Sequence, residues 1–272
     1  MNAPDARTRK GRLTRAIDLL LNHRDELVAA LSADFGARSP DMSMPTDIAA
    51  AVAPLRNARA NLETWMRPQA RKITPAALGL LGAKAHVRYQ PKGVVGVMTP
   101  WNFPVQLSFD AIAGAFAAGN RVMLKPSEYS PATSALMGQL IDLYFDEDEL
   151  AVVQGGPEVG AAFAGLPFDH LIFTGATSIG RHVMRAAADN LTPVTLELGG
   201  KSPVIVGKSA DIAKSAARIM GGKAMNAGQV CLAPDYVLAP AGSVDAFVSA
   251  ATAAGAKMKL LVGCSSIEIC RS

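Results

Sequence analysis

Residues 94–128 read VVGVMTPWNFPVQLSFDAIAGAFAAGNRVMLKPSE, and this stretch decides the fold class. Two short apolar runs within it, at 94–98 and 121–124, are typical of buried parallel strands. The longer apolar segment between them, at 105–118, predicts a helix. A strand, a helix and a second strand in this order predict a parallel βαβ unit.

The same alternation of strands and helices continues towards the C-terminus. It predicts an α/β fold with a doubly wound parallel sheet of about five strands between 94 and 206. Ligands of such sheets bind at the carboxyl ends of the strands, so the loops after the strands should carry the chemistry. We expect these further helices at 131–144, 157–164 and 178–189, and these further strands at 151–153, 170–173, 192–196 and 203–206.

On the N-terminal side, apolar residues recur at helical spacing over 12–35 and again over 46–66, which predicts two amphipathic helices. Residues 68–84 show little periodicity and are expected to form a loop. Residues 86–89 alternate between polar and apolar side chains, which predicts a short strand.

The composition excludes several classes of function. The net charge is +4, and the basic cluster between Arg7 and Arg15 could contact nucleic acid or form a transit sequence. Acidic residues follow this cluster at once and favour a solvated helix start. No apolar run reaches the roughly 18 residues of a membrane helix, and no secretory signal is visible. Three cysteines without zinc-like spacing predict neither a disulfide framework nor a metal site, and they favour the cytoplasm.

Two polar motifs follow predicted strands early in the sheet. In TPWNFP (99–104), the amide of Asn102 could donate to a developing oxyanion, or it could satisfy its own loop. In KPSE (125–128), Lys125 and Glu128 could grip the vicinal hydroxyls of a ribose. The alternative for KPSE is a solvated turn with a helix cap at Ser127.

Three later motifs offer a phosphate site, a base and a nucleophile. FTGATSIG (173–180) places glycines at a helix N-terminus, which suits pyrophosphate, although the GxxxxG spacing could mark only a tight turn. Glu197 ends a mostly apolar strand, where burial would make it a general base, unless it pairs with Lys201 or another cation. Cys231 follows glycine and polar residues, which favours an accessible thiol over a core cysteine.

These motifs, together with LELGGKSP (196–203) and GQVC (228–231), resemble the aldehyde dehydrogenase superfamily from about residue 12 to about 240. The segments LTPVT (191–195) and CLAPDY (231–236) look most like the branch of fatty-aldehyde and coniferyl-aldehyde dehydrogenases. The resemblance implies an aldehyde dehydrogenase-like, Rossmann-type sheet with an incomplete catalytic domain. It divides the chain into an N-terminal helical part (1–85), an NAD(P)-binding domain (86–207) and a partial catalytic domain (208–272).

The resemblance also implies a role for each matching residue. Cys231 attacks the aldehyde carbon, Asn102 and the Cys231 backbone N–H hold the oxyanion, and Glu197 activates the water that releases a carboxylic acid. The expected cofactor is NAD, because Glu128 would face a 2′-phosphate, but NADP is possible. The expected partner is a small aldehyde, with no nucleic acid, membrane or metal, and full-length relatives form homo-oligomers. The matching cofactor contacts are Pro100, Trp101, Lys125, Glu128, Gly156, Thr174, Gly175, Ala176, Thr177, Ser178, Ile179 and Gly180.

The resemblance ends before the family pattern does. Members of the family carry a second Glu, in an ExFGP motif, that holds the nicotinamide ribose, and a late strand that joins subunits. Neither is in this sequence, and the residues from about 257 do not resemble the family. We therefore expect a C-terminally truncated chain in which Cys264 and Cys270 have no role. The alternatives to an active enzyme are a cofactor-binding remnant without turnover and a misfolding fragment.

Overall fold

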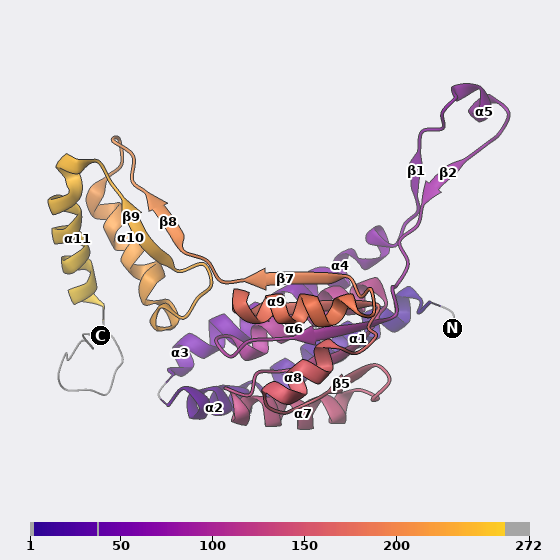
Figure 1. The fold of residues 1–272 in the computed structure, drawn as a ribbon, viewed down its shortest axis with the longest axis horizontal. Helices are drawn as coiled ribbons and strands as arrows, with labels where there is room; N and C mark the ends of the chain where they lie inside the picture. Colours follow the sequence, from indigo (N-terminus) through magenta and orange to yellow (C-terminus); the bar gives the residue numbers. More distant parts are fainter. Residues whose placement is uncertain (1–2, 37, 259–272) are drawn as a thin grey trace.

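The computed structural model describes residues 3–36 and 38–258. At its centre, five parallel strands lie in the order β5-β4-β3-β6-β7 (Figure 1). The chain runs outward from β3 to β5, then returns to the other side of β3 for β6 and β7, which confirms the doubly wound parallel sheet. The strands are β3 (Val94–Met98), β4 (Arg121–Lys125), β5 (Leu150–Val152), β6 (His170–Gly175) and β7 (Val194–Leu198).

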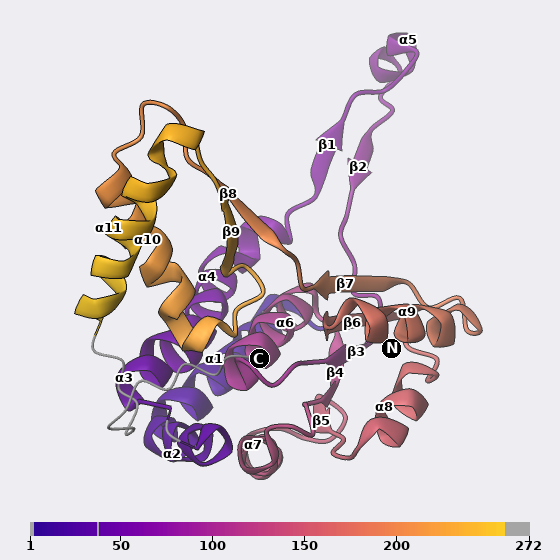
Figure 2. The same cartoon turned by 60° about the vertical axis from the view of Figure 1, so that its left-hand side comes forward.

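Helices cover both faces of this sheet (Figure 2). On one face α6 (Pro104–Ala118) and α7 (Pro131–Tyr144) share a core with strand residues such as Val95, Val97 and Leu124. On the other face α8 (Pro157–Ala164) and α9 (Thr177–Ala188) pack over a smaller core around Phe173. These four helices begin and end within a residue or so of the predicted bounds.

The N-terminal helical layer packs on α6 and α7, and it corrects the prediction of one helix over 12–35. The chain forms α1 (Ala6–Asn22) and α2 (Arg24–Phe35), because His23 leaves the helical conformation at φ −111° and ψ 19°. Asp5 starts α1 early by accepting from the Thr8 N–H at 2.8 Å. The predicted helix over 46–66 is α4 (Ala50–Trp65), preceded by α3 (Pro40–Ser43) and the π-helical turn η1 (Met44–Ala49).

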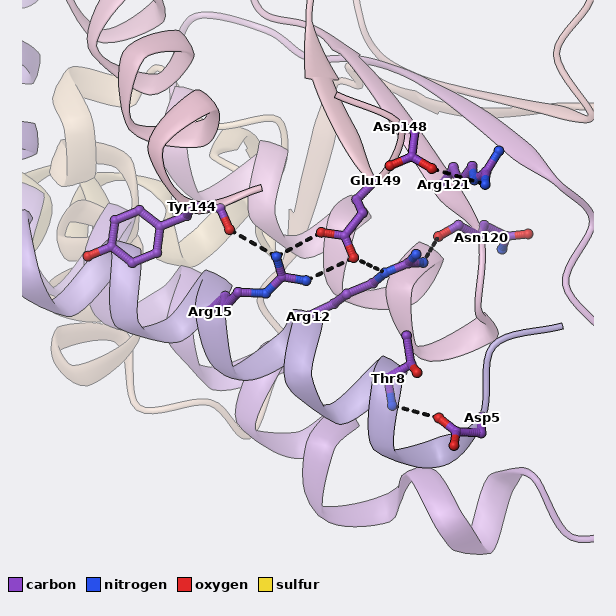
Figure 3. A network of polar contacts seen from close by, with 9 residues as sticks. All are labelled: Asp5, Thr8, Arg12, Arg15, Asn120, Arg121, Tyr144, Asp148 and Glu149. Carbon is purple, nitrogen blue, oxygen red and sulfur yellow. Dashed lines mark hydrogen bonds and ion pairs between the residues drawn. The ribbon is translucent and has the colours of Figure 1, made fainter. Parts of the chain in front are cut away.

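Three basic residues of α1, Arg9, Arg12 and Arg15, bind their own chain, so the expectation of a solvated helix start is wrong for them, whereas Arg7 is exposed (Figure 3). Arg12 Nε and Arg15 Nη2 each donate to Glu149 Oε1 at 2.9 Å, and Arg15 Nη1 lies 2.7 Å from Glu149 Oε2. Arg12 also donates to the Asn120 carbonyl at 3.2 Å. Arg9 is buried and donates to the Ala117 carbonyl at 3.0 Å. These contacts tie α1 to the end of α6 and to the start of β5.

The segment expected to be a loop, 68–84, instead belongs to a projecting arm (Figure 1). β1 (Gln69–Arg71) pairs antiparallel with β2 (Ala85–Val87), and the short helix α5 (Ala76–Leu80) forms the tip. All three residues of β1 are exposed, so the strand has no buried face that would impose an alternating pattern on the sequence.

A second correction concerns 203–206, which does not join the central sheet. β8 (Ser202–Ile205) pairs in parallel with β9 (Pro234–Leu238), and α10 (Ile212–Ala224) connects them through the turn η2 (Met225–Gly228). The turn η3 (Ala241–Ser243) and α11 (Val244–Lys257) follow. This C-terminal unit lies beyond the carboxyl end of β7 (Figures 1 and 2). Among the described residues, we find no helix with the length and hydropathy needed to span a bilayer.

Candidate active site

The loop after β3 presents Asn102 at the carboxyl edge of the sheet. The Asn102 Nδ2 donates to the Gln229 carbonyl at 3.0 Å, so its amide reaches across to the segment before Cys231 and does not bond within its own loop. The Asn102 carbonyl accepts from Arg38 Nη1 at 3.2 Å and from Asn226 Nδ2 at 3.0 Å. The loop is thus held from the N-terminal layer and from the C-terminal unit.

Asn102, Glu197 and Cys231 line one cavity of about 460 Å³. Cys231 is a free thiol and is exposed, as the sequence predicted. The turn that leads to it is unusual, because Asn226 (φ 48°), Ala227 (φ 55°) and Gly228 (φ 79°) all lie in the left-handed region. Non-glycine residues rarely adopt this conformation, and it often marks a functional site. The three residues reverse the chain after α10 and bring Cys231 to the cavity.

Glu197 corrects the sequence prediction in one respect, because its side chain is exposed and not buried. β7 is an edge strand, and its residues alternate between the sheet's packed face and solvent, so Val194, Leu196 and Leu198 are partly covered while Glu197 is not. The alternative pairing with Lys201 is not observed in the described part of the chain. Lys201 Nζ lies 3.3 Å from Asp235 Oδ2.

A second cavity, of about 620 Å³, adjoins the first. The loops after β3, β4 and β6 form one side of it, and α8 and α9 form the other. It lies at the point where the strand order reverses between β3 and β6, which is where doubly wound sheets bind their ligands. Five residues line both cavities and form their shared wall: Pro100, Trp101, Thr174, Gly175 and Ala176.

Lys125 and Glu128 form an ion pair on the wall of this larger cavity, with 2.7 Å between Lys125 Nζ and Glu128 Oε2. Partial burial acts to raise the pKa of Glu128, but the hydrogen bond and the charge of Lys125 outweigh it, and the pKa is lowered. Among the residues that the structure describes, Ser127 caps no helix, and its Oγ accepts from the Tyr129 N–H at 3.2 Å. Asp34 caps α7 instead, because its two carboxylate oxygens accept from the N–H groups of Ala132 and Thr133.

The glycine-containing turn ends at the N-terminus of α9. In the described part of the chain, no side chain caps this helix, so its first amides are available to a ligand. Gly180 packs against β7, where an added Cβ would lie 2.9 Å from Leu198 Cδ2. Ile179 lines the larger cavity, whereas Gly180, Thr177, Ser178 and Gly156 do not. Gly156 precedes α8 as its N-cap residue.

Sequence reasoning missed Asp110, which also lines the smaller cavity. Asp110 lies on α6, where a charged residue within a helix reads as part of a solvated face. The residue as a whole is exposed, but burial around its carboxyl raises the pKa of Asp110. Sequence reasoning also missed Arg38 and Asn226, which touch Asn102 only through its backbone carbonyl.

The fold and the two adjoining cavities define a class of protein: a doubly wound α/β fold whose larger cleft leads to a cysteine, a glutamate and an asparagine. The model of the Aldehyde dehydrogenase family matches residues 1–264, and the chain belongs to this family. The match extends past residue 240, where the resemblance was expected to end, and into the residues from about 257 that were expected not to resemble the family. Cys264 and Cys270 lie outside the described residues.

The most similar relatives include a probable coniferyl aldehyde dehydrogenase of Caulobacter vibrioides, which is 61% identical over 251 residues. A coniferyl aldehyde dehydrogenase of a Pseudomonas species is 57% identical over 244 residues. These alignments cover 92% and 90% of this chain, but only 52% and 50% of the relatives. The chain therefore spans about half the length of the curated relatives it matches.

Solved structures agree with the fold. The substrate-bound state of Staphylococcus aureus AldH aligns with a TM-score of 0.86 and 36% identity, over 92% of this chain and 54% of that one. An aldehyde dehydrogenase of Mycobacterium tuberculosis complexed with NAD+ aligns with a TM-score of 0.83 and 30% identity, over 94% of this chain and 52% of that one. The predicted family and fold class are confirmed.

Proposed function

We propose that this chain supplies the nucleophile, the base and the cofactor contacts of an NAD(P)-dependent aldehyde dehydrogenase. The observation that carries the proposal is the shared wall. Asn102, Glu197 and Cys231 line one cavity, and Lys125 and Glu128 line the cavity on the other side of Pro100, Trp101 and the turn at 174–176. An aldehyde at Cys231 would then lie next to the reacting end of a dinucleotide.

The residues of the larger cavity fit such a cofactor. Lys125 can donate to, and Glu128 can accept from, the two hydroxyls of a ribose. The uncapped N-terminus of α9 suits the diphosphate. Ala161 and Ala164 of α8 and Val183 and Ala186 of α9 give the same cavity an apolar lining that suits a flat base. When bound, the nicotinamide supplies the acceptor for a hydride.

The residues of the smaller cavity fit the chemistry of aldehyde oxidation. The Cys231 thiolate adds to the carbonyl carbon, and the resulting oxyanion accepts from Asn102 Nδ2 and from the Cys231 N–H. An amide nitrogen carries two hydrogens, so Asn102 can keep its bond to Gln229 while it donates to the oxyanion. Loss of hydride leaves a thioester at Cys231. Glu197 then takes a proton from water, which attacks the thioester, releases the carboxylic acid and restores the thiolate.

We propose an apolar, aromatic aldehyde of the coniferyl type as the substrate. The proposal rests on the names of the relatives and on the lining of the smaller cavity. Apart from the polar groups above, that lining includes Trp101, Leu107, Ala111, Ile172 and Leu198.

The test is to incubate the purified chain with NAD and coniferyl aldehyde and to measure its intact mass. The expected product is an acyl adduct on Cys231 that forms only when NAD is present. Glu197→Gln should make the adduct accumulate, and Cys231→Ala should abolish it. A wild-type chain that binds NAD, measured by titration calorimetry, yet forms neither adduct nor NADH would favour the second candidate function, a cofactor-binding remnant. The exposure of Cys231 and Glu197 is the observation that favours this candidate.

A further inference from the structure

A fully buried ion pair lies beneath the Asn102 loop and has no part in the chemistry proposed above. Arg38 Nη2 lies 2.7 Å from Asp47 Oδ2, and the two side chains are 4% and 0% exposed. The Arg38 guanidinium lies over the rings of Phe35 and Phe103, at 4.8 and 5.1 Å from their centroids. Removing both charges from water carries a large desolvation penalty, so the pair makes only a weak case for stability alone.

The pair holds the chain at two points that follow the Asn102 side chain. At the first point, Arg38 Nη1 donates to the Asn102 carbonyl at 3.2 Å. At the second point, Asp47 Oδ1 accepts from the N–H groups of Val105 and Gln106, each at 3.2 Å, and so fixes the first turn of α6. Because the Asn102 carbonyl and the helix that follows it are both bound to the pair, the backbone that carries the Asn102 amide cannot shift without breaking these hydrogen bonds.

We infer that Arg38 and Asp47 are positioning residues that aim the Asn102 amide at the oxyanion formed on Cys231. The inference rests on the proposed function, because it needs Asn102 to be the oxyanion donor. Catalytic groups tolerate displacements of only about 0.5 Å, and their support comes from locked neighbours such as this pair. Asn226 of the turn η2 adds to this support, because its Nδ2 donates to the same carbonyl at 3.0 Å.

A purely structural ion pair makes a different prediction, and two reactions of Cys231 separate the two roles. With p-nitrophenyl acetate, the thiolate attacks the ester carbonyl, passes through an oxyanion, expels p-nitrophenolate and keeps the acetyl group. With iodoacetamide, the thiolate displaces iodide from a CH₂ carbon and no oxyanion forms. The ratio of the two rates therefore reports oxyanion stabilisation and cancels changes in thiol exposure or ionisation.

The experiment measures both rates on the 272-residue chain by mass spectrometry of the peptide that contains Cys231. Asn102→Ala should lower the acylation-to-alkylation ratio by about 100-fold, the effect of losing one oxyanion donor. Arg38→Met and Asp47→Asn should lower it by about 10-fold to 100-fold, because a displacement of about 1 Å can already cost about 100-fold. Arg38→Lys keeps the positive charge but loses the planar guanidinium. Compared with Arg38→Met, it should therefore restore thermal stability more fully than it restores the acylation-to-alkylation ratio.

The matched control is Glu149→Gln, which breaks the other ion-pair cluster of the N-terminal layer. It should lower the unfolding temperature and leave the ratio unchanged. If Arg38→Lys and Asp47→Asn fold, yet keep the wild-type ratio while Asn102→Ala loses it, the pair is only structural and the inference is overturned. If Asn102→Ala also keeps the wild-type ratio, the proposed oxyanion donor is wrong, and the inference falls with it.

Discussion

Glu128 carries its negative charge next to Lys125, on the wall of the larger cavity. Its lowered pKa keeps it ionised at neutral pH. A 2′-phosphate on the ribose would therefore meet a like charge. Two charges about 4 Å apart interact by on the order of 1 kcal/mol or more. Glu128→Gln should therefore improve the affinity for NADP, relative to that for NAD, by about five-fold or more. Titration calorimetry with both cofactors measures this.

Glu158→Gln is the control for that substitution. It removes the same charge from the start of α8, at an exposed position that is not among the residues lining the cavity. An equal gain of NADP affinity in both variants would mean that only the overall charge matters, and the role of Glu128 in cofactor choice would have to be abandoned.

Asp110 should weaken the fold at neutral pH. Burial raises its pKa in the folded state above the ordinary value of 3.8, so keeping it ionised costs stability at every pH above the raised pKa. As the pH falls through the raised pKa, the folded chain takes up a proton and the cost disappears. Asp110→Asn should therefore raise the unfolding temperature at pH 7, with a gain that shrinks towards pH 3.8. Differential scanning calorimetry across this range is the measurement, and a gain that does not depend on pH would rule out ionisation as its cause.

The candidate site was predictable where a residue's own type reveals its chemistry. Asn102, Lys125, Glu128 and Glu197 are polar residues at or just after the carboxyl ends of β3, β4 and β7, and these ends meet at one edge of the sheet. Cys231 follows α10 and the turn η2, and its thiol marked it as a candidate nucleophile. Arg38 was not predictable in this way. It acts on a backbone carbonyl 64 residues away, and no spacing in the sequence encodes that contact.

At the scale of the elements, Glu149 joins α1 to the start of β5. Burial acts to raise the pKa of Glu149, but hydrogen bonds from Arg15 and Arg12 outweigh it and the pKa is lowered. The stabilisation is thus complete above the ordinary pKa of 4.5 and is lost as the pH falls through the lowered value. Glu149→Gln should lower the free energy of unfolding by about 3 kcal/mol at pH 7, because it leaves the buried guanidinium of Arg12 without its partner.

Urea unfolding of both proteins at pH 7 and at a pH below 4.5 tests this assignment. The difference in free energy of unfolding between wild type and Glu149→Gln should be smaller at the lower pH. An equal difference in free energy of unfolding at both pH values would show that packing, and not the carboxylate charge, accounts for the loss of stability.

The elements that sequence patterns predicted well are those whose burial is simple. The central strands β3, β4 and β6 are covered on both faces, so their apolar runs mark them clearly. β1 is exposed throughout and β8 pairs with a strand that begins about 30 residues later, so neither leaves a local signal of its partner. The break at His23 was missed because the apolar periodicity continues across it.

At the scale of the whole molecule, the central sheet and the C-terminal unit differ in how much they bury. Ala216 is the buried residue of α10, and none of the described residues of α11 is buried. Ile205, Leu232 and Leu238 are 77%, 78% and 53% exposed. Local stability follows buried apolar contacts, so the two parts should open at different rates.

Hydrogen exchange followed by mass spectrometry should show this difference directly. Amides of β8, β9 and α11 should exchange at least about ten-fold faster than those of β3, β4 and β6, which corresponds to a difference of about 1.4 kcal/mol in opening free energy. Uniform protection across the two parts would mean that the chain opens as one cooperative unit.

The wall of five residues between the two cavities also bears on how new substrate preferences can evolve. A substitution at Trp101 or Thr174 would change the shape of both cavities at once. In the proposed function, a variant selected there for a new aldehyde would therefore also change its affinity for the cofactor. Leu107, Asp110 and Ala111 line only the smaller cavity. Substitutions that adapt the site to other aldehydes should therefore accumulate in this short stretch of α6, where aldehyde preference can change while cofactor affinity stays the same.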